Sequence, residues 1–440
     1  MSKLRRIVIA AVIIYIFLLL SPIAGLDIPR ILGIIDRQPY LVLRYILIGI
    51  ANGGIFAIIA LGYTMVYGII QLINFAHGDV YMMATFFSLY VIAALGTTST
   101  SEPGQIFITI VIALIVAILF GAGLNAAIER AAYRRLRNAP RLAPLISAIG
   151  VSFILENLGQ LMANQGYIQF LTPYFGLSGG FAQKNYPDLI KSQDVVTALN
   201  LQSVSVDFIK GHEMLTILIV GLLALGLLWF FAKTSFGRKL RDAALEKHIK
   251  IQRLIVITAG VISTFSFIAA ILNAVNTKAN NENNFSMKEL MVIVVAIVLM
   301  LALRWFIANT RLGKAMRATA ENRDAAKIMG INIDRIITVT FMLGGGLAGA
   351  AAVLNGLYVN TAWWLMGFQA GLRSFTAAVL GGIGNVTGAM LGGFLIGVLT
   401  SLSDGLFDPS WTRAWVFSVL VLVLIFRPTG LLGEHVGQKA

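Results

Sequence analysis

The 440-residue sequence contains no cysteine and few charged residues. The absence of cysteine excludes disulfide bonds, thiolate metal sites and cysteine nucleophiles. Charged residues make up 12% of the chain, roughly half of their usual share in soluble domains. Hydrophobic residues make up 58%, and a soluble chain of this composition would expose large apolar patches. The composition therefore excludes an ordinary soluble protein.

The sequence also lacks the common motifs for phosphate binding and hydrolysis. It has no GxxxxGK[ST] loop, no GxSxG nucleophile elbow and no HExxH pair. We expect no enzyme activity, no metal site and no cofactor on this chain. If the protein does work that needs ATP, the nucleotide is expected to bind another subunit.

Long apolar runs recur along the whole chain. A bilayer core about 30 Å thick is crossed by roughly 20 apolar residues in a helix. The sequence therefore predicts an all-α polytopic membrane protein, with about eleven transmembrane helices plus broken or half-spanning segments. The expected spans lie near residues 7–25, 43–65, 78–96, 105–128, 143–163, 214–232, 254–276, 290–308, 336–358, 386–404 and 411–427.

The first apolar run, residues 7–25, follows the basic start MSKLRR, as the core of a signal peptide would. It is long for such a core, and Ser21, Pro22 and Ala24 make a poor cleavage site. We favour a retained first helix, with cleavage as the alternative.

The net charge of +14 is concentrated in a few loops. Arginine and lysine gather at 129–141, 233–253 and 309–335, which the positive-inside rule places in the cytoplasm. This placement argues for a lipid bilayer rather than nucleic acid as the partner of the basic residues. With both chain ends in the cytoplasm, residues 164–213 form an outside loop. A further crossing or half-crossing is then needed at 373–384.

Two stretches of the chain resemble each other. The sequence that begins at Glu213 aligns with the one that begins at Glu289, sharing a Trp-Phe pair, a Thr-x-x-Gly step and a later asparagine. The offset is 76 positions up to Arg241 and 82 positions from Arg253 onward, so the first copy lacks six residues between these arginines. We predict that residues 210–285 are an inserted duplicate of a helix–loop–helix unit.

The second copy carries Gly345 and Gly349, a small-xxx-small pair that allows helix backbones to approach closely. The aligned residues of the first copy are Ser263 and Phe267, and this phenylalanine would block such an approach. The span 336–358 is therefore predicted to lie in the core, and the corresponding span of the first copy at the periphery.

The stretch YTMVYGIIQLINFAHGDVYMMA places Asn74, His77, Gly78 and Asp79 between apolar runs. Two ligands spaced as His77-x-Asp79 are too few for a convincing metal site. A broken helix at membrane depth would explain the motif, with Asn74 or Asp79 as a cap and Gly78 allowing the bend. Such breaks line substrate pathways in transporters. The alternative is a tight turn at the membrane surface.

The stretch FTAAVLGGIGNVTGAMLGGFLIG is rich in glycine. The spacing of Gly388 and Gly392 allows close helix packing. Gly384 and Asn385 are a second candidate for a break that faces the pathway. Glu156 lies inside an expected span and is a functional candidate by default, although a solvated or capping role fits it equally well.

Five motifs occur in a characteristic order: ALGYTMVYGIIQLINFAHGDVYMMA, IERAAYRRLRNAPRLAPLISAIG, RLGKAMRATAENRDAAKIMGINIDR, SFTAAVLGGIGNVTGAMLGG and RPTGLLG. Together they closely resemble the LivH-type permease of the branched-chain amino acid ABC importer family, over roughly 43–163 and 286–432. The chain then divides into an N-terminal extension with one added helix (1–42), an N-terminal permease part (43–209), the inserted unit (210–285) and a C-terminal permease part with a coupling loop (286–440).

The resemblance implies a role for the charged segment Ala318 to Asn332. In such importers a short cytoplasmic helix of each permease docks on the ATPase subunit, and this segment looks like that coupling helix. Its residues at i, i+7 and i+11 are small or apolar and would share one docking face, and charged residues would add polar contacts. The residues assigned to coupling are Ala318, Glu321, Arg323, Asp324, Ala325, Met329 and Gly330.

The resemblance also implies partners and a location. They are a second homologous permease, two ABC ATPase subunits and an extracytoplasmic amino-acid-binding protein, in the plasma membrane of a bacterium. The implied function is import of neutral, branched-chain amino acids. Urea or short amides are an alternative cargo. A channel or ion-coupled secondary transporter is the competing class, but it would need intramembrane charges, for which Glu156 is the one candidate that the sequence suggests.

Overall fold

The computed structural model describes residue 34 and residues 39–163, 183–190 and 286–433, except 73, 137–138, 141, 408 and 428. The chain divides into two compact units, and the account below concerns the larger one, to which 47–163, 183–190 and 288–433 belong. Three predicted spans lie outside the described residues, at 7–25, 214–232 and 254–276. The whole inserted unit up to residue 285 lies outside them as well.

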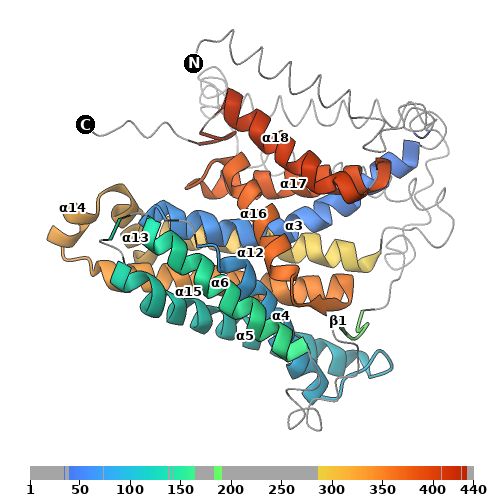
Figure 1. Cartoon of the computed structure of the whole chain (residues 1–440). Coiled ribbons are helices and arrows are strands. Elements are labelled where there is room, and N and C mark those ends of the chain that lie inside the picture. Colours follow the sequence, from blue (N-terminus) through green and yellow to red (C-terminus); the bar gives the residue numbers. More distant parts are fainter. Residues whose placement is uncertain are drawn as a thin grey trace, which may run out of the picture. The chain divides into compact units, whose positions relative to one another are not determined.

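The described residues are almost entirely helical, as the sequence predicts (Figure 1). Every predicted span that falls among them is a helix. Seven described helices are long and apolar enough to cross a membrane. The longer helices are α3 (Pro39–Ile70), α4 (His77–Ala94), α5 (Pro103–Ile128), α6 (Leu142–Ala163), α12 (Met287–Asn309), α15 (Ile333–Val359), α16 (Met366–Gly381), α17 (Val386–Leu406) and α18 (Thr412–Phe426).

Short elements connect these helices. A π-helical turn and a 3-10 turn extend α5 through Glu129–Tyr133 and Arg134–Leu136, and a further 3-10 turn, Pro409–Trp411, precedes α18. Two helices between α12 and α15 are α13 (Arg311–Glu321) and α14 (Arg323–Ile328). Strand β1 (Gln183–Asn185) pairs antiparallel with β2 (Thr361–Trp363), which follows α15 directly.

The additional crossing expected at 373–384 corresponds to α16, which begins earlier, at Met366. Its 16 residues span about 24 Å at 1.5 Å per residue, less than the roughly 30 Å of a bilayer core. α17 then returns alongside it, because a backbone turn at Gly382–Asn385 separates the two helices. α16 is therefore a short helix packed against its successor.

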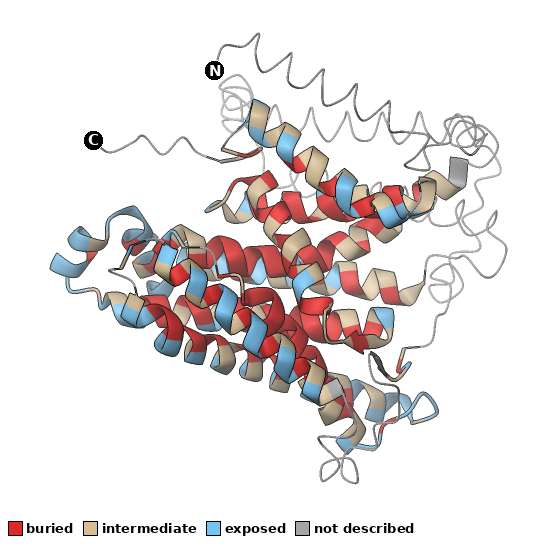
Figure 2. Ribbon diagram, in the orientation of Figure 1, coloured by how far each residue is buried: buried red, intermediate tan, exposed pale blue. Residues whose placement is uncertain are grey.

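Helix α15 lies at the centre of the larger unit. Of its most apolar stretch 78% is buried, against 11% for α18, so α15 is internal and α18 is peripheral (Figure 2). A Cβ atom on Gly121 of α5 would overlap the carbonyl of Gly345 on α15, and one on Gly349 would overlap the carbonyl of Ala117. The two backbones are thus in direct contact, which only very small residues permit.

Helices α16 and α17 are held together in the same way. A Cβ atom on Gly388 would overlap the Gly381 carbonyl, and one on Gly392 would overlap the Ala377 carbonyl. The glycine-rich stretch therefore forms two backbone-to-backbone helix contacts, one within the α16–α17 pair and one, through Gly393 and Ala57, with α3.

The α5–α15 contact predicts that alanine substitutions at two glycines of α5 change stability differently. Gly121→Ala should destabilise the fold by about 1–3 kcal/mol, because the added methyl meets backbone that cannot rotate away. Gly123 is exposed, and its added Cβ meets nothing within 4 Å. Gly123→Ala should therefore be neutral or stabilising by up to about 1 kcal/mol. Thermal unfolding followed by tryptophan fluorescence measures both, and equal melting temperatures for the two variants would contradict the contact.

Candidate functional site

The first polar motif forms a break between two helices. α3 ends at Ile70, Gln71 adopts a left-handed conformation with φ 55°, and α4 begins at His77. The residue that precedes α4 is Ala76, and no side chain caps the helix. The expectation that Asn74 or Asp79 caps this end is therefore wrong, because both side chains form hydrogen bonds with other helices instead.

The break is buried within the protein. Tyr63 of α3 packs edge-on against His77, with 4.8 Å between ring centroids, and a Cβ on Gly62 would overlap the imidazole. From Gly62 to the end of α3 at Ile70 is about 12 Å at 1.5 Å per residue. The first residue of α4 therefore lies beside Gly62, about 12 Å before the end of α3. This position favours a broken helix over a tight turn at the surface.

The motif residues around the start of α4 are almost fully buried. Exposed fractions are 2% for Asn74, 0% for His77 and 1% for Asp79. The Ser152 hydroxyl of α6 donates a hydrogen bond to the Asp79 carboxylate. Gly78 lies within α4 and does not bend it; a Cβ there would overlap the carbonyl of Gly367 on α16. Gly78 therefore allows α4 and α16 to approach.

Asn74 belongs to a hydrogen-bonded cluster that the sequence did not reveal. Its amide donates to the Asn125 side-chain oxygen at 3.1 Å, and its own oxygen accepts from the Tyr133 hydroxyl at 3.1 Å. The Asn125 amide in turn donates to the Phe341 carbonyl at 2.7 Å. The break, α5 and α15 are therefore joined by side-chain hydrogen bonds in a region without exposed atoms. A lone asparagine inside the apolar run of α5 was the available signal.

The second predicted break separates α16 from α17. Gly382 and Gly384 have φ of 107° and 93°, values that other residues rarely adopt. Asn385 caps α17 by accepting from the Gly388 amide at 3.0 Å, and it donates to the Leu432 carbonyl at 2.8 Å. Gly384 itself is exposed and lies near Gly68, two residues before the end of α3. The turn is thus at that end of α3, and its role in the pathway stays a prediction.

The segment predicted to couple to an ATPase is not one helix. α13 ends at Glu321, and Asn322 takes an extended conformation and caps α14 by accepting from the Ala325 amide at 3.0 Å. The expected single face through Ala318, Ala325 and Met329 is therefore wrong. The physical reason is that an asparagine cap competes with helix continuation.

The short α14 nevertheless presents an unusual surface. Its last residue, Ile328, and the following Met329 are 85% and 80% exposed, and exposed charges of Asp324 and Lys327 lie beside them. Gly330, with φ 82°, ends the helix and turns the chain toward α15. Figure 1 shows α13 and α14 beyond one end of α15, and β1 near the opposite end.

Arg323 connects α14 to the first break. Its guanidinium donates to the Ile69 carbonyl, with Nε at 3.1 Å, and so binds an end carbonyl of α3 that has no partner within the helix. This contact is internal to the chain, so Arg323 supplies more than the polar docking contact that the sequence suggested. A hollow of about 360 Å³ lies beside it, lined by Gln71, Thr319, Glu321 and neighbouring residues.

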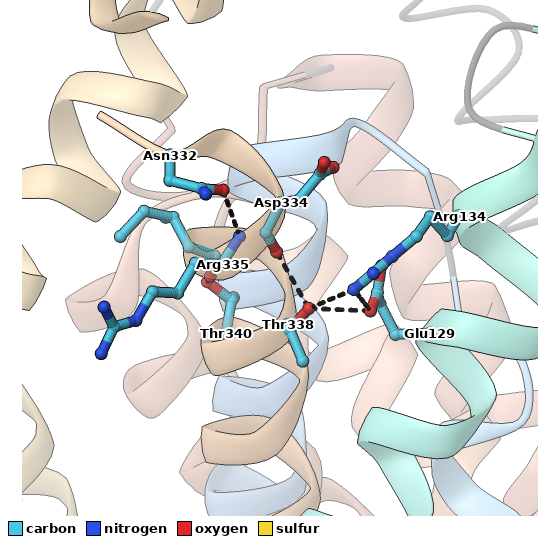
Figure 3. A network of polar contacts seen from close by, with 8 residues as sticks. Glu129, Arg134, Asn332, Asp334, Arg335, Thr338 and Thr340 are labelled. Atoms are coloured by element: carbon cyan, nitrogen blue, oxygen red, sulfur yellow. Dashed lines mark hydrogen bonds and ion pairs between the residues drawn. The ribbon is translucent and has the colours of Figure 1, made fainter. Parts of the chain in front are cut away.

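An ion pair between a buried carboxylate and an exposed arginine lies where α15 begins (Figure 3). The Glu129 carboxylate is fully buried and accepts from Arg134 at 2.9 Å and from the Thr338 hydroxyl at 2.9 Å. Thr338 is one and a half turns into α15, and Asn332 caps that helix by accepting from the Arg335 amide at 3.0 Å. The end of α5 is thereby tied to the start of α15, directly after the charged segment.

The asparagine cluster predicts a specific loss of stability. Asn125→Ala removes two hydrogen bonds and leaves the Asn74 amide and the Phe341 carbonyl without them, so the fold should lose about 1–2 kcal/mol. Asn157→Ala is the control, because Asn157 is exposed and, among the described residues, its side chain forms a hydrogen bond only within its own helix. Melting temperatures of the purified variants measure the effect. A melting temperature for Asn125→Ala that matches the control would show that the cluster contributes nothing.

Comparison with known proteins places this arrangement in a family. The family described as the permease component of branched-chain amino acid transport systems matches residues 45–276 and 244–426. The LivH permease protein of a high-affinity branched-chain amino acid transport system from Salmonella typhimurium is 32% identical over 391 residues, which cover 89% of this chain and 95% of that protein.

Other relatives agree. The BraD permease protein of Pseudomonas aeruginosa is 32% identical over 401 residues, covering 91% of this chain and 98% of that protein. A LivH permease protein, described as probable, from Methanocaldococcus jannaschii is 25% identical over 304 residues, covering 64% and 96%. No solved structure matches the chain. The chain therefore belongs to the family of membrane permease components of branched-chain amino acid transport systems.

Proposed function

We propose that this chain is a transmembrane subunit of an ATP-driven importer of branched-chain amino acids in the bacterial inner membrane. It acts with a second, homologous permease, two ATPase subunits and an extracytoplasmic binding protein. Family membership supports the transport role. The observation that supports coupling to an ATPase is the exposed pair Ile328 and Met329 at the end of a charged helical segment.

Among the described residues, Ile328 and Met329 are the most exposed of the large apolar side chains. Residues such as Phe107 and Leu119 lie inside long apolar helices, where lipid covers them. Ile328 and Met329 lie between charged residues in a segment between the predicted spans, so lipid does not cover them. A partner protein that buries two large apolar side chains this exposed would gain favourable apolar contact.

The position of α14 suggests how a push on it reaches the transport part of the protein. Arg323 attaches α14 to the end of α3, next to the buried break at Asn74. Gly330 and the Asn332 cap attach it to α15, which Glu129 and Thr338 tie to α5. Movement of α14 on the ATPase would therefore act on α3 and α15 together. Helix α3 leads into the break, and α15 is joined to the break through the hydrogen bonds of Asn125.

Import of urea or short amides remains the alternative cargo, and a channel or secondary transporter remains the other class. Loss of uptake in the absence of ATPase subunits would count against the second. Within the proposed function, Asn74, His77 and Asp79 act at the joint between α3 and α4, since their burial leaves them no open surface in this conformation.

Coupling can be tested at α14. The double variant Ile328→Ser, Met329→Ser should weaken ATPase binding about 10–100-fold, since truncation of central apolar contacts typically costs 2 kcal/mol or more. Co-purification of the ATPase measures the loss of binding, and uptake of leucine into cells measures its effect on transport. Leu312→Ser, on the part-exposed start of α13, is the control and should retain both.

Two charge-reversal variants test whether α14 or the duplicated loop docks on the ATPase. Glu321→Lys with Asp324→Lys should uncouple ATP hydrolysis from uptake. The same reversal at Asp242 and Glu246, in the shorter duplicated loop, should do little. If the second pair is the more damaging, the duplicated loop is the docking element and the assignment to α14 is wrong.

The orientation in the membrane follows from the basic loops. The cysteine-free chain allows single-cysteine labelling with an impermeant reagent. Ala320→Cys, exposed on α13, should be labelled only after the cell is opened, because the segment is expected to be cytoplasmic. Ser99→Cys, in the exposed loop between α4 and α5, should be labelled in intact cells. Labelling of Ala320→Cys in intact cells would invert the topology.

A further inference from the structure

A second hollow, of about 240 Å³, opens at the end of α15 that is distant from α14. Helices α3, α4, α15, α16 and α17 all contribute side chains to it. Asn355 lies 22 residues after the start of α15, about 33 Å away along the helix. With α14 in the cytoplasm, this hollow faces the side from which the cargo arrives. Its volume is below the roughly 300–1,000 Å³ of pockets for drug-sized ligands, so it suits a smaller molecule.

Two opposite charges line this hollow. Arg373 of α16 is half-buried, and its guanidinium lies 5.7 Å from the centre of the Phe56 ring, an arrangement that orients the cation. Asp404 of α17 interacts with it electrostatically, but no ion pair joins these two described residues. Within the described part of the chain Arg373 donates no side-chain hydrogen bond. A planar guanidinium held this way is suited to a carboxylate.

Uncharged polar groups complete the wall. The side-chain amides of Asn52, Asn355 and Gln369 line the same hollow and make no side-chain hydrogen bond to any residue that the structure describes. Polar groups that converge on one hollow without partners are characteristic of a ligand site. One carboxylate oxygen of Asp404 accepts a hydrogen bond from the Thr412 hydroxyl of α18, which positions the Asp404 side chain.

Part of the remaining lining is apolar. It includes Ile55, Phe56, Met366 and Ala370, with Trp363 of β2. These side chains offer a surface for an aliphatic group, while Tyr81, Thr361 and Thr400 add hydroxyl groups elsewhere in the lining. The hollow therefore combines a cation, an anion and an apolar surface.

We propose that this hollow binds the cargo as a zwitterion, with Arg373 on the carboxylate, Asp404 on the ammonium group and the apolar wall on the branched side chain. The proposal rests on the amino-acid cargo of the proposed function. In this proposal the permease itself recognises the ammonium and carboxylate groups of the α-amino acid. A neutral cargo such as urea would have no use for the two charges.

Labelling protection tests this directly, without ATP or uptake. Val359→Cys, half-exposed at the rim, is introduced into the full-length chain assembled with its partner subunits, and the rate of maleimide labelling is measured. Leucine should slow labelling. Leucinamide, which lacks the carboxylate, and 4-methylpentanoate, which lacks the ammonium group, should protect only at about tenfold or higher concentration, because each loses a charge-assisted contact. Ser99→Cys is the control and should be unaffected by leucine.

Variants at a second site test which charged residue contacts which group of leucine. Combined with Val359→Cys, Arg373→Gln should abolish selection of leucine over leucinamide, and Asp404→Asn should abolish selection over 4-methylpentanoate. Arg373→Lys should keep selection, and unchanged labelling without ligand shows that each variant is folded. The proposal is overturned if leucine gives no protection at Val359→Cys, or if selection survives both neutral variants. A failure of coupling would leave the protection unchanged, so the two proposals can fail separately.

Discussion

The direct contact between the backbones of α5 and α15 positions everything else in the larger unit. Gly121 against Gly345 and Ala117 against Gly349 leave no side chain between the helices, so neither can slide without a clash. α15 therefore serves as a fixed rod about 40 Å long, since it has 27 residues. The charged segment joins one end of this rod, and the hollow lined by Arg373 and Asp404 lies at the other.

Polar side chains in this protein are concentrated where the helices stop or begin. The Asn74–Asn125–Tyr133 cluster lies at the break between α3 and α4, and Glu129 with Thr338 lies where α5 ends and α15 starts. Irregular backbone inside a membrane protein must find its hydrogen bonds within the protein. These groups supply such bonds and at the same time make each joint specific, because alternative packings would leave buried polar atoms unpaired.

Among the described residues, the sequence predicts the spanning helices, both breaks and the close helix packing at glycine well, because span length and glycine act locally. It failed at Asp79, which was expected to cap a helix, because Ser152, a residue distant in the chain, donates a hydrogen bond to its carboxylate. It also failed at a local signal, because the predicted docking face crosses Asn322, where α13 ends and α14 begins. Arg373 and Asp404 were overlooked because each is a lone charge in its own segment, and only the packing of α16 on α17 brings them to one hollow.

The hydrogen bond that attaches α14 to α3 joins a side chain to a main-chain group. The donor is the side chain of Arg323, whereas the acceptor is the main-chain carbonyl of Ile69. Every residue type has that carbonyl, so no substitution at position 69 removes it, provided that α3 keeps its length. Substitutions can therefore remove this hydrogen bond only at position 323. A lineage that replaced Arg323 would need another cation or another hinge, whereas a substitution of the buried Ile69 leaves the acceptor of this hydrogen bond in place.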